Sequence, residues 1–462
     1  MKYNISFILR ISLISALGGL LFGYDWVVIG GAKPFYEKFF NISQIPSLQG
    51  WAMSSALLGC IFGASISGII SEKYGRKKSL IISALLFTVS AIGTGYASSF
   101  SFFIIYRLLG GMGIGLASTQ SPIYIAEISP ESLRGRFVSL NQLTIVIGIL
   151  LAQIINYLIA EPVSRDASLE GIASSWNGQW GWRWMFWAET VPAASFLILA
   201  FFIPESPRWL VKMGKRDESN QILKKIGGIH FANITMEQIS SSIANSIGKV
   251  DFKKLFDKNV YPIVIIGIVL AVFQQWCGIN VVFNYAEEVF GAAGYGVNEI
   301  LFNIILTGAV NLFFTVIAIL SVDKWGRKNL MLLGSIGLAV FYIILGIFYY
   351  IDVQGIPVLI VIVSSIAIYA MTLAPVTWVV LSEIFPNKVR GSAMAVATTA
   401  LWIACFILTY TFPLLNRSLN SYGTFWLYAA ICILGFIFIK RNLIETKGKS
   451  LEEVEEIFKS ST

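Results

Sequence analysis

Charged residues, histidine and cysteine are all scarce in this chain of 462 residues. Only 13% of the residues are Asp, Glu, Lys or Arg, whereas 56% are hydrophobic. This composition excludes an ordinary soluble domain and is typical of a polytopic membrane protein. The single histidine, His230, argues against a histidine-based metal centre or catalytic triad. The cysteines fall within apolar runs, and we interpret them as packing residues rather than disulfides or metal ligands: Cys60, Cys277, Cys405 and Cys432.

The sequence also lacks the patterns of an enzyme. No nucleophile–base pair, metal-ligand cluster or phosphate-binding glycine loop is visible in it. The glycine-rich run at 110–115 lies inside an apolar segment, where glycine allows close contact between helices. We therefore expect neither catalytic activity nor a cofactor.

Long apolar runs dominate the chain instead. A membrane-spanning helix needs about 20 mostly apolar residues, and continuous rather than alternating runs indicate helices and not barrel strands. The first run contains Asp25 and has no clear cleavage site, so we interpret it as a span and not as a signal peptide. Twelve spans are predicted, near 8–31, 51–70, 79–97, 101–124, 138–160, 183–203, 259–285, 300–321, 329–350, 356–381, 392–413 and 423–440.

The net charge of +8 is distributed unevenly over the loops between these spans. Lys and Arg gather in alternate loops, so by the positive-inside rule both termini are expected in the cytoplasm. The basic charge then directs insertion and does not indicate a nucleic-acid surface. The intervening loops are short and poor in Lys and Arg, the main exceptions being Lys33, Lys38, Arg165 and Arg417. The basic loops hold Lys73, Arg76, Lys77, Lys78, Arg134, Arg136, Lys324, Arg327, Lys328, Lys388 and Arg390.

The two halves of the chain resemble each other in sequence. Residues 72–77 recur as 323–328, and residues 127–135 recur as 383–391 with the same internal spacing. Two six-helix halves of the same orientation are the parallel-repeat plan of secondary transporters.

A third, looser pair joins residues 205–208 to residues 445–448. We therefore predict an all-α polytopic membrane protein built from two pseudo-symmetric six-helix halves. The predicted domains are an N-terminal half at 1–203, a cytoplasmic linker with short helices at 204–258, a C-terminal half at 259–441 and a cytoplasmic tail at 442–462.

The span predicted at 259–285 contains three amides, Gln274, Gln275 and Asn280. Amides are unfavourable in hydrocarbon unless they face the protein interior or a water-filled cavity. Hydrogen bonding between helices is one interpretation. A polar ligand site is the other, because three amides within seven residues group neutral donors and acceptors together.

These motifs, in this order and over nearly the whole chain, resemble those of the sugar porters of the major facilitator superfamily. The motifs that carry the resemblance lie at 75–78, 134–136, 204–209, 274–280, 323–327 and 445–448. The resemblance implies a twelve-helix fold with a sugar site at the membrane midplane between the halves. For the two tryptophans, simple packing bulk is the alternative. The implied substrate-binding residues are Gln142, Gln274, Gln275, Asn280, Asn311, Trp378 and Trp402.

Three positions depart from the pattern of the family. Asn284 stands where relatives commonly have Tyr, and Ala374 precedes Pro375 where Gly is usual. Leu401 precedes Trp402 where a polar residue is common, which removes a hydrogen-bonding group from the expected pocket. The sugar is therefore left open between a pentose and a hexose, with D-xylose and D-glucose favoured.

Asp25 lies within the first predicted span, and its expected partner is Arg107 near the start of the fourth. A carboxylate inside a span is a functional candidate by default, and its ionisation can differ between two conformations. The resemblance adds that proton-coupled sugar porters carry Asp here, whereas passive facilitators have Asn. We therefore predict that Asp25 and Arg107 couple transport to a proton. A static buried ion pair is the alternative.

The repeated loop charges are the predicted conformational switch. Cytoplasmic salt bridges would hold the inner ends of the halves together in the outward-open state, and breaking them would give alternating access. Charge that only directs insertion is the alternative for the lysines, but acidic residues contribute little to orientation. The predicted residues are Arg76, Glu127, Arg134, Glu205, Arg327, Glu383 and Arg390.

The predicted function is therefore proton-coupled uptake of a monosaccharide by alternating access. A passive facilitator of the same fold and a membrane sugar sensor are the alternatives, although a sensor would carry a longer cytoplasmic extension after Lys440. The expected partners are the sugar, the proton as coupling ion and the lipid bilayer, with the monomer as functional unit. Short external loops favour a bacterial cytoplasmic (inner) membrane.

Overall fold

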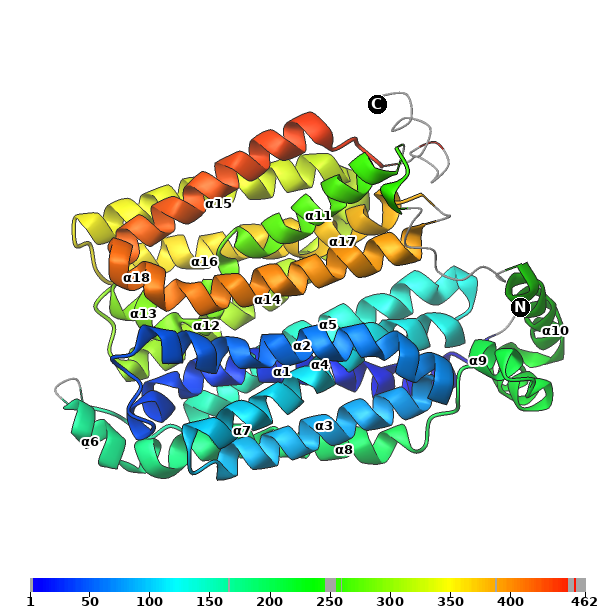
Figure 1. The fold of residues 1–462 in the computed structure, drawn as a ribbon, viewed down its shortest axis with the longest axis horizontal. Coiled ribbons are helices and arrows are strands. Elements are labelled where there is room, and N and C mark those ends of the chain that lie inside the picture. Colours follow the sequence, from blue (N-terminus) through cyan, green and yellow to red (C-terminus); the bar gives the residue numbers. More distant parts are fainter. Residues whose placement is uncertain are drawn as a thin grey trace. The chain divides into compact units, whose positions relative to one another are not determined.

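The computed structural model describes residues 3–164, 167–245, 255–258, 260–386, 389–447 and 453. Arg165, Lys388 and Gly448 therefore lie outside the described residues, as do part of the predicted linker and most of the predicted tail. The described residues fold almost entirely into helices (Figure 1).

The first half of the chain forms five long helices and a sixth span made of two shorter pieces. Those pieces, α7 and α8, meet at Glu189, which precedes the first residue of α8. Two short helical segments come directly before them, and two helices of the predicted linker follow. The bounds are α1 (Ile5–Phe39), α2 (Pro46–Tyr74), α3 (Arg76–Tyr96), α4 (Phe100–Ile128), η1 (Glu131–Leu133), α5 (Arg134–Ile159), α6 (Leu169–Ser174), η2 (Asn177–Gly181), α7 (Trp182–Ala188), α8 (Thr190–Ala200), α9 (Pro207–Lys212) and α10 (Arg216–Asn245).

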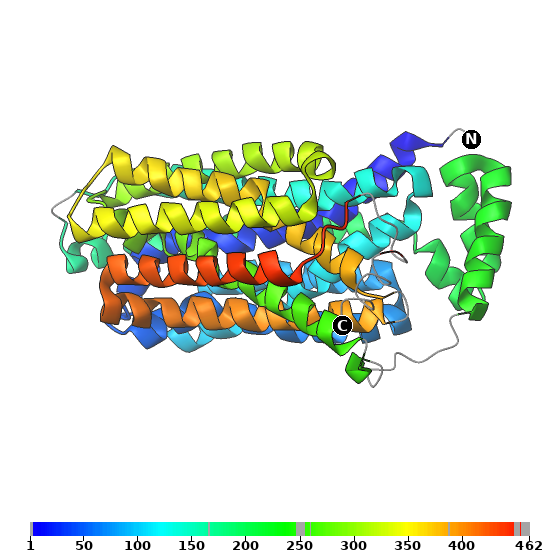
Figure 2. The same cartoon turned by 90° about the horizontal axis from the view of Figure 1, so that it is seen from above.

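The second half of the chain forms six spans, of which two are interrupted and two are joined in a single helix. The long α18 reverses direction at Asn420, whose φ is 57°, and so supplies two antiparallel spans (Figures 1 and 2). The bounds are α11 (Tyr261–Trp276), α12 (Ile279–Asn284), α13 (Ala286–Gly291), α14 (Val297–Trp325), α15 (Arg327–Tyr350), α16 (Ile356–Met371), α17 (Leu373–Ile384) and α18 (Arg390–Asn442).

The predicted membrane-spanning helices are confirmed. Among the described residues, ten helices are long and apolar enough to cross a membrane, with α11–α12 and α16–α17 each counted as one. Dividing α18 at Asn420 and adding the α7–α8 pair gives the predicted twelve. Large apolar side chains are exposed along these helices, as expected where lipid replaces water: examples are Phe62, Ile69 and Ile198, which are 56%, 70% and 60% exposed.

Contacts along the backbone divide the described chain into two compact units. Unit one comprises the described parts of Met1–Trp26, Leu58–Ala152 and Arg183–Lys249, and unit two those of Val27–Leu57, Gln153–Trp182 and Val250–Thr462. Within unit one, α3 packs against α4 and α8. Within unit two, α18 packs against α11 and α15. The C-terminal end of α1 thus belongs with the second half of the chain, which matters for the charged cluster described below.

Candidate substrate and coupling sites

The three amides of the seventh span lie on either side of a helix break at Gly278. This residue has φ 87° and ψ −4°, in the left-handed region that favours glycine. An added Cβ would lie 2.7 Å from the ring of Tyr428, so the available space also requires glycine. The break places Gln274 and Gln275 in the last turn of α11 and Asn280 in the first turn of α12.

The three amides form one continuous chain of hydrogen bonds. Asn280 Nδ2 donates to Gln275 Oε1 at 2.5 Å, and Gln275 Nε2 donates to Gln274 Oε1 at 2.7 Å. Gln274 Nε2 then donates to the hydroxyl of Tyr369 on α16 at 3.2 Å. All three amides are less than 10% exposed. Such a row of neutral donors and acceptors suits the hydroxyl groups of a polyol, which carry no net charge.

The other predicted substrate residues are distributed over both units. Asn311 on α14 and Trp402 on α18 are buried, whereas Trp378 on α17 is 37% exposed. Within unit two, α17 packs against α11, α14 and α18, so these three residues and the amide chain belong to one group of helices. Gln142 lies on α5 in unit one and is half-buried.

Asn284, one of the departures from the family pattern, supplies an unsatisfied acceptor. It ends α12 and is 5% exposed, and its Oδ1 has no hydrogen-bond partner among the described residues. Buried amide oxygens are normally paired, so an unpaired one is a position for a ligand donor. Leu401, in contrast, is a buried apolar residue next to Trp402. Of these two departures from the family pattern, Asn284 therefore adds a polar side chain to the candidate substrate group, whereas Leu401 does not.

Asp25 and Arg107 form the ion pair that the sequence predicts. Each side chain is 2% exposed, and Arg107 Nη1 contacts Asp25 Oδ1. Arg107 also lies over the ring of Phe186 on α7, at 5.7 Å from the guanidinium carbon to the ring centroid. A second buried carboxyl, Glu189, interacts electrostatically with both members of the pair and is itself 2% exposed. Two carboxyls thus share one guanidinium, and in a dry environment the surplus negative charge favours binding of a proton.

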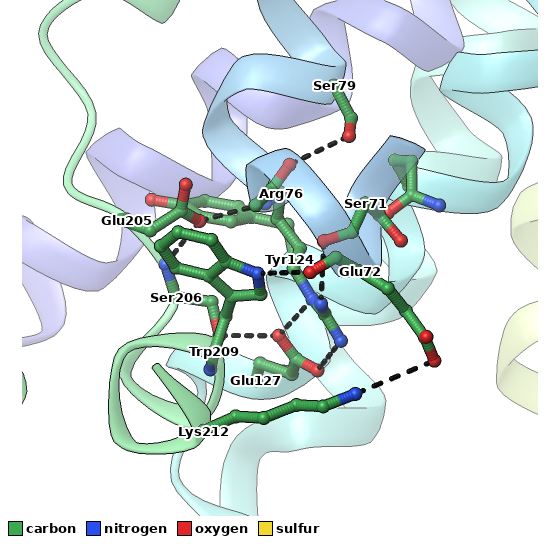
Figure 3. A network of polar contacts seen from close by, with 12 residues as sticks. Ser71, Glu72, Arg76, Ser79, Tyr124, Glu127, Glu205, Ser206, Trp209 and Lys212 are labelled. Carbon is green, nitrogen blue, oxygen red and sulfur yellow. Dashed lines mark hydrogen bonds and ion pairs between the residues drawn. The ribbon is translucent and has the colours of Figure 1, made fainter. Parts of the chain in front are cut away.

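A second ionic cluster joins the start of α3 to the end of α4 (Figure 3). Arg76 donates to both oxygens of Glu127, each at 2.9 Å, in a bidentate pair. Glu205 accepts from the backbone amides of Arg76 and Lys77 at 2.9 and 3.1 Å, so it caps the N-terminus of α3. The hydroxyl of Ser206 donates to Glu127 at 2.5 Å.

The cap of α3 depends on Gly75. Its φ of 92° and ψ of 169° are accessible almost only to glycine. A Cβ there would lie 2.1 Å from Glu205 Oε2. Burial raises the pKa of the Glu205 carboxyl, and its hydrogen bonds to backbone amides oppose that rise.

The second half of the chain repeats this cluster. Arg327 Nη2 donates to Glu383 Oε1 at 3.1 Å, and Glu445 accepts from the backbone amides of Arg327 and Lys328 at 2.8 and 3.1 Å. The hydroxyl of Thr446 donates to Glu383 at 2.5 Å. The third, looser sequence pair therefore supplies the same two contacts in each half, a carboxylate cap and a hydroxyl.

Two other predicted switch residues bind backbone carbonyls. Arg134 Nε donates to the carbonyl of Ala126 near the end of α4, at 3.1 Å. Arg390 Nε and Nη2 both donate to the carbonyl of Phe385, just after α17, at 3.2 Å. Each arginine thus satisfies a carbonyl near a helix C-terminus, where cationic groups are favourable.

A model of the protein family described as "Sugar (and other) transporter" matches residues 11–458. The chain belongs to this family. The D-xylose-proton symporter of Escherichia coli (strain K12) is 40% identical over 100% of this chain and 98% of that protein. The arabinose-proton symporter of Bacillus subtilis (strain 168) is 38% identical over 99% of this chain and 96% of that protein.

The fold of this transporter agrees with that of a solved relative. A structure of the xylose transporter XylE from E. coli, in an inward open conformation, matches with a TM-score of 0.85 and 38% identity, over 97% of this chain and 99% of that one. The predicted major facilitator fold is therefore confirmed, and this multi-pass membrane protein is a transporter rather than an enzyme.

Sequence reasoning missed three residues of these sites. Glu189 is an acidic residue inside the sixth predicted span, so the rule that singled out Asp25 also applied to it. Glu445 was visible only as part of a repeated motif and not as a helix cap. Tyr369 gave no signal, because a tyrosine in an apolar span is usually a packing residue and only the fold brings it to Gln274.

The tenth span of the transporter is broken although it lacks the usual glycine. The break falls at Thr372, with φ −123° and ψ −88°, between α16 and α17 and two residues before Ala374. The Thr372 hydroxyl donates at 2.5 Å to the carbonyl of Ile368, which lies near the end of α16. A serine or threonine bond of this kind commonly bends a helix.

Proposed function

We propose that this transporter takes up a monosaccharide together with a proton, by alternating access, across a bacterial cytoplasmic membrane. The observation that carries the proposal is the buried pair of Asp25 and Arg107 with Glu189 beside it. Two of the relatives that match nearly the whole chain are named as proton symporters of D-xylose and of arabinose. A pentose, first of all D-xylose, is therefore the proposed substrate class, with D-glucose next.

The proposed proton step follows from the charge balance of this triad. When a proton binds Asp25, the ion pair with Arg107 weakens and the guanidinium turns to Glu189, the remaining carboxylate. The helices that carry these groups, α1, α4 and the α7–α8 pair, can then change their mutual packing without leaving a buried charge unpaired. Release of the proton on the other side restores the original pair.

The proposed sugar contacts are those of the amide chain and its neighbours. Hydroxyl groups of the sugar would bind Gln142, Gln274, Gln275, Asn280 and Asn311, and an aromatic side chain would cover the C–H face. Trp378 and Trp402 are the proposed aromatic contacts. Both termini are proposed to be cytoplasmic, the ionic clusters at Arg76 and Arg327 are proposed to switch between conformations, and the monomer is the proposed functional unit.

Asp25→Asn tests the coupling. In proteoliposomes with a proton gradient, we expect this variant to lose accumulation of D-xylose above equilibrium while it retains counterflow, which moves no net proton. The matched control is Glu170→Gln on α6, an exposed carboxylate that should leave both activities unchanged. Accumulation that persists in Asp25→Asn would overturn the coupling assignment, and D-xylose binding to the purified variant checks that it is folded.

A passive facilitator is separated from a symporter by the pH of the medium. Sugar added to cells or vesicles without an imposed gradient should raise the external pH if each sugar enters with a proton. No pH change, with uptake intact, would favour the facilitator. Competition of labelled D-xylose by unlabelled pentoses and hexoses then defines the substrate.

A further inference from the structure

A third ionic cluster surrounds Lys33, one of the lysines that departs from the distribution of positive charge in the loops. Lys33 is 1% exposed and its Nζ contacts three carboxylates. The distances are 3.1 Å to Glu37 Oε1, 3.2 Å to Glu287 Oε2 and 2.6 Å to Glu288 Oε1. Lys33 and Glu37 lie near the C-terminal end of α1, and the other two lie on α13, all within unit two.

The cluster carries more negative than positive charge. Lys38 adds a second ammonium, 3.4 Å from Glu287 Oε1, so three carboxylates face two lysines. The groups line a pocket of about 300 Å³, to which Gln49 and Leu169 also contribute. Lys33 and Glu37 are buried, whereas the side chains of Glu287 and Glu288 are 25% and 19% exposed. Surplus negative charge in such a partly desolvated site is unfavourable, and it favours the uptake of a proton by a carboxylate.

The hydrogen bonds identify which carboxyl can hold that proton. Both oxygens of Glu287 face ammonium groups, those of Lys33 and Lys38. The oxygens of Glu37 face Lys33 and the side-chain amide of Gln49, which donates to Oε2 at 2.8 Å. Glu288 has Lys33 at Oε1, whereas its buried Oε2 has no hydrogen-bond partner among the described residues. Glu37 Oε1 also has no hydrogen-bond partner, but it faces the Lys33 ammonium. Among the described carboxyls of this cluster, Glu288 is therefore the one that can be protonated at an oxygen facing neither an ammonium group nor a hydrogen-bond donor.

Among the described residues, the pocket is lined by no cation besides Lys33 and Lys38. Glu288 interacts with Lys33 and Glu37 from α1 and with Glu287 from its own helix. Tyr285, which precedes α13, donates its hydroxyl to the carbonyl of Thr409 at 2.6 Å. The α13 helix lies outside the candidate spans, which end at Asn284 and resume at Val297. Burial raises the pKa of the Glu288 carboxyl to about 7, against the lowering effect of the Lys33 ammonium.

The cluster lies at the opposite end of α14 from the Arg327–Glu383 pair. Glu288 lies on α13, the helix that precedes α14, and Arg327 is two residues after the last residue of α14. A helix of 29 residues is about 43 Å long at 1.5 Å per residue. If the Arg327 cluster is cytoplasmic, as the proposed topology has it, the Lys33 cluster faces the outside.

We propose that this pocket is a second proton-binding site, in which Glu288 takes up a proton when α1 and α13 close on each other and releases it when they separate. The assignment of this pocket to the outside of the membrane rests on the proposed function, whereas proton binding by Glu288 does not depend on it. Separation hydrates the carboxylate and returns its pKa to an ordinary value near 4.3. The closed cluster is therefore stabilised as the pH falls from about 7 towards about 4.3, by up to about tenfold in its equilibrium constant per pH unit.

Infrared titration of the purified full-length protein tests the site without any transport measurement. We expect a protonated-carboxyl band in the Asp25→Asn protein that disappears with a midpoint near pH 7, and its loss in Asp25→Asn/Glu288→Gln. Adding Glu287→Gln instead balances the charges of the cluster and should move the midpoint to lower pH. Adding Glu170→Gln, the exposed control, should leave the band unchanged. A titration that is the same with and without Glu288 overturns the proposal.

Counterflow of D-xylose supplies the functional readout. Counterflow by Asp25→Asn should depend on external pH with the same midpoint, and Asp25→Asn/Glu288→Gln should show a flat profile. Equal pH dependence in the two proteins would show that closure is not linked to this carboxyl. Failure of Asp25→Asn to lose accumulation would contradict the proposed coupling residue but would leave the infrared result for Glu288 unaffected.

Discussion

The ionic cluster of unit one and its counterpart in unit two are built from the same parts, but the contacts described for them differ. Both pair an arginine with a glutamate, cap the following helix with a second glutamate and add a hydroxyl. The unit-one arginine, Arg76, binds its glutamate through two hydrogen bonds, and a further helix, α9, docks beside it (Figure 3). Trp209 on α9 donates to the carbonyl of Glu72 at 3.0 Å, and Lys212 lies 3.7 Å from the Glu72 carboxylate.

This comparison distinguishes the contacts that recur in both halves from those described in unit one alone. The arginine, the two glutamates and the hydroxyl recur, so they belong to the duplicated cluster that we propose as the switch. The contacts of α9 belong to unit one and connect the linker to that half. If both clusters break and reform during transport, the docking of α9 should make the unit-one cluster the more stable of the two.

The glycines before the caps should show the largest effect. Gly75→Ala forces an alanine into a conformation that disfavours it by about 1–3 kcal/mol, and its Cβ would meet Glu205 Oε2 at 2.1 Å. The Cβ of Gly326→Ala would lie 2.6 Å from Glu445 Oε2, so the loss of stability should be smaller than for Gly75→Ala. The thermal unfolding midpoints of the two variants in detergent show which substitution is the more destabilising. Gly135→Ala is the control, because a Cβ there has nothing within 4 Å; a larger loss for Gly326→Ala than for Gly75→Ala would contradict the comparison.

Removing the glutamate of each pair should have an intermediate effect. Glu127→Gln leaves Arg76 without its bidentate partner, with an expected loss of about 1–3 kcal/mol. Glu383→Gln should cost less, since the Arg327 contact is longer and Glu383 is 22% exposed against 11% for Glu127. The unfolding midpoints of the two variants give the comparison. Glu218→Gln, in an exposed pair with Lys215, should be nearly neutral, and equal losses in the first two would mean that the clusters are equivalent.

The docking of α9 should show the smallest effect. Trp209→Phe keeps the aromatic ring but removes the hydrogen bond to the Glu72 carbonyl, with an expected loss of about 0.5–1.5 kcal/mol. Trp180→Phe, at a residue 54% exposed, is the matched control. Because no counterpart of α9 lies among the described residues of unit two, Trp209→Phe should bring the stability of the unit-one cluster closer to that of its counterpart, and adding it to Glu127→Gln should lower the stability further. A double variant no less stable than Glu127→Gln would remove α9 from the explanation.

The span pattern and the Asp25–Arg107 pair could be predicted because they follow from local chemistry. An apolar run of sufficient length has few alternatives to a membrane helix, and a carboxylate inside such a run needs a partner. The same logic singled out the amides of the seventh span. It could also have found Glu189, since the residue lies in a predicted span.

Other parts of the sites depend on contacts between distant segments. Lys33 and Glu288 are about 250 residues apart, and their ion pair exists only because α1 ends beside α13. The departure of Lys33 from the charge pattern was visible in the sequence, but its three carboxylates were not. The left-handed Gly278, which positions Asn280 against Gln275, is likewise a property of the backbone.

The amide chain of α11 and α12 has a direction, since each amide donates to the next from Asn280 to Tyr369. Hydrogen bonds in such a row polarise one another, so reversing one requires reversing its neighbours. A sugar epimer places one hydroxyl in a different direction, and where that hydroxyl can no longer donate or accept as the row requires, it would meet a collective mismatch rather than a single poor contact. Stereochemical selectivity can thus arise from a row of identical neutral groups, without a dedicated residue for each hydroxyl.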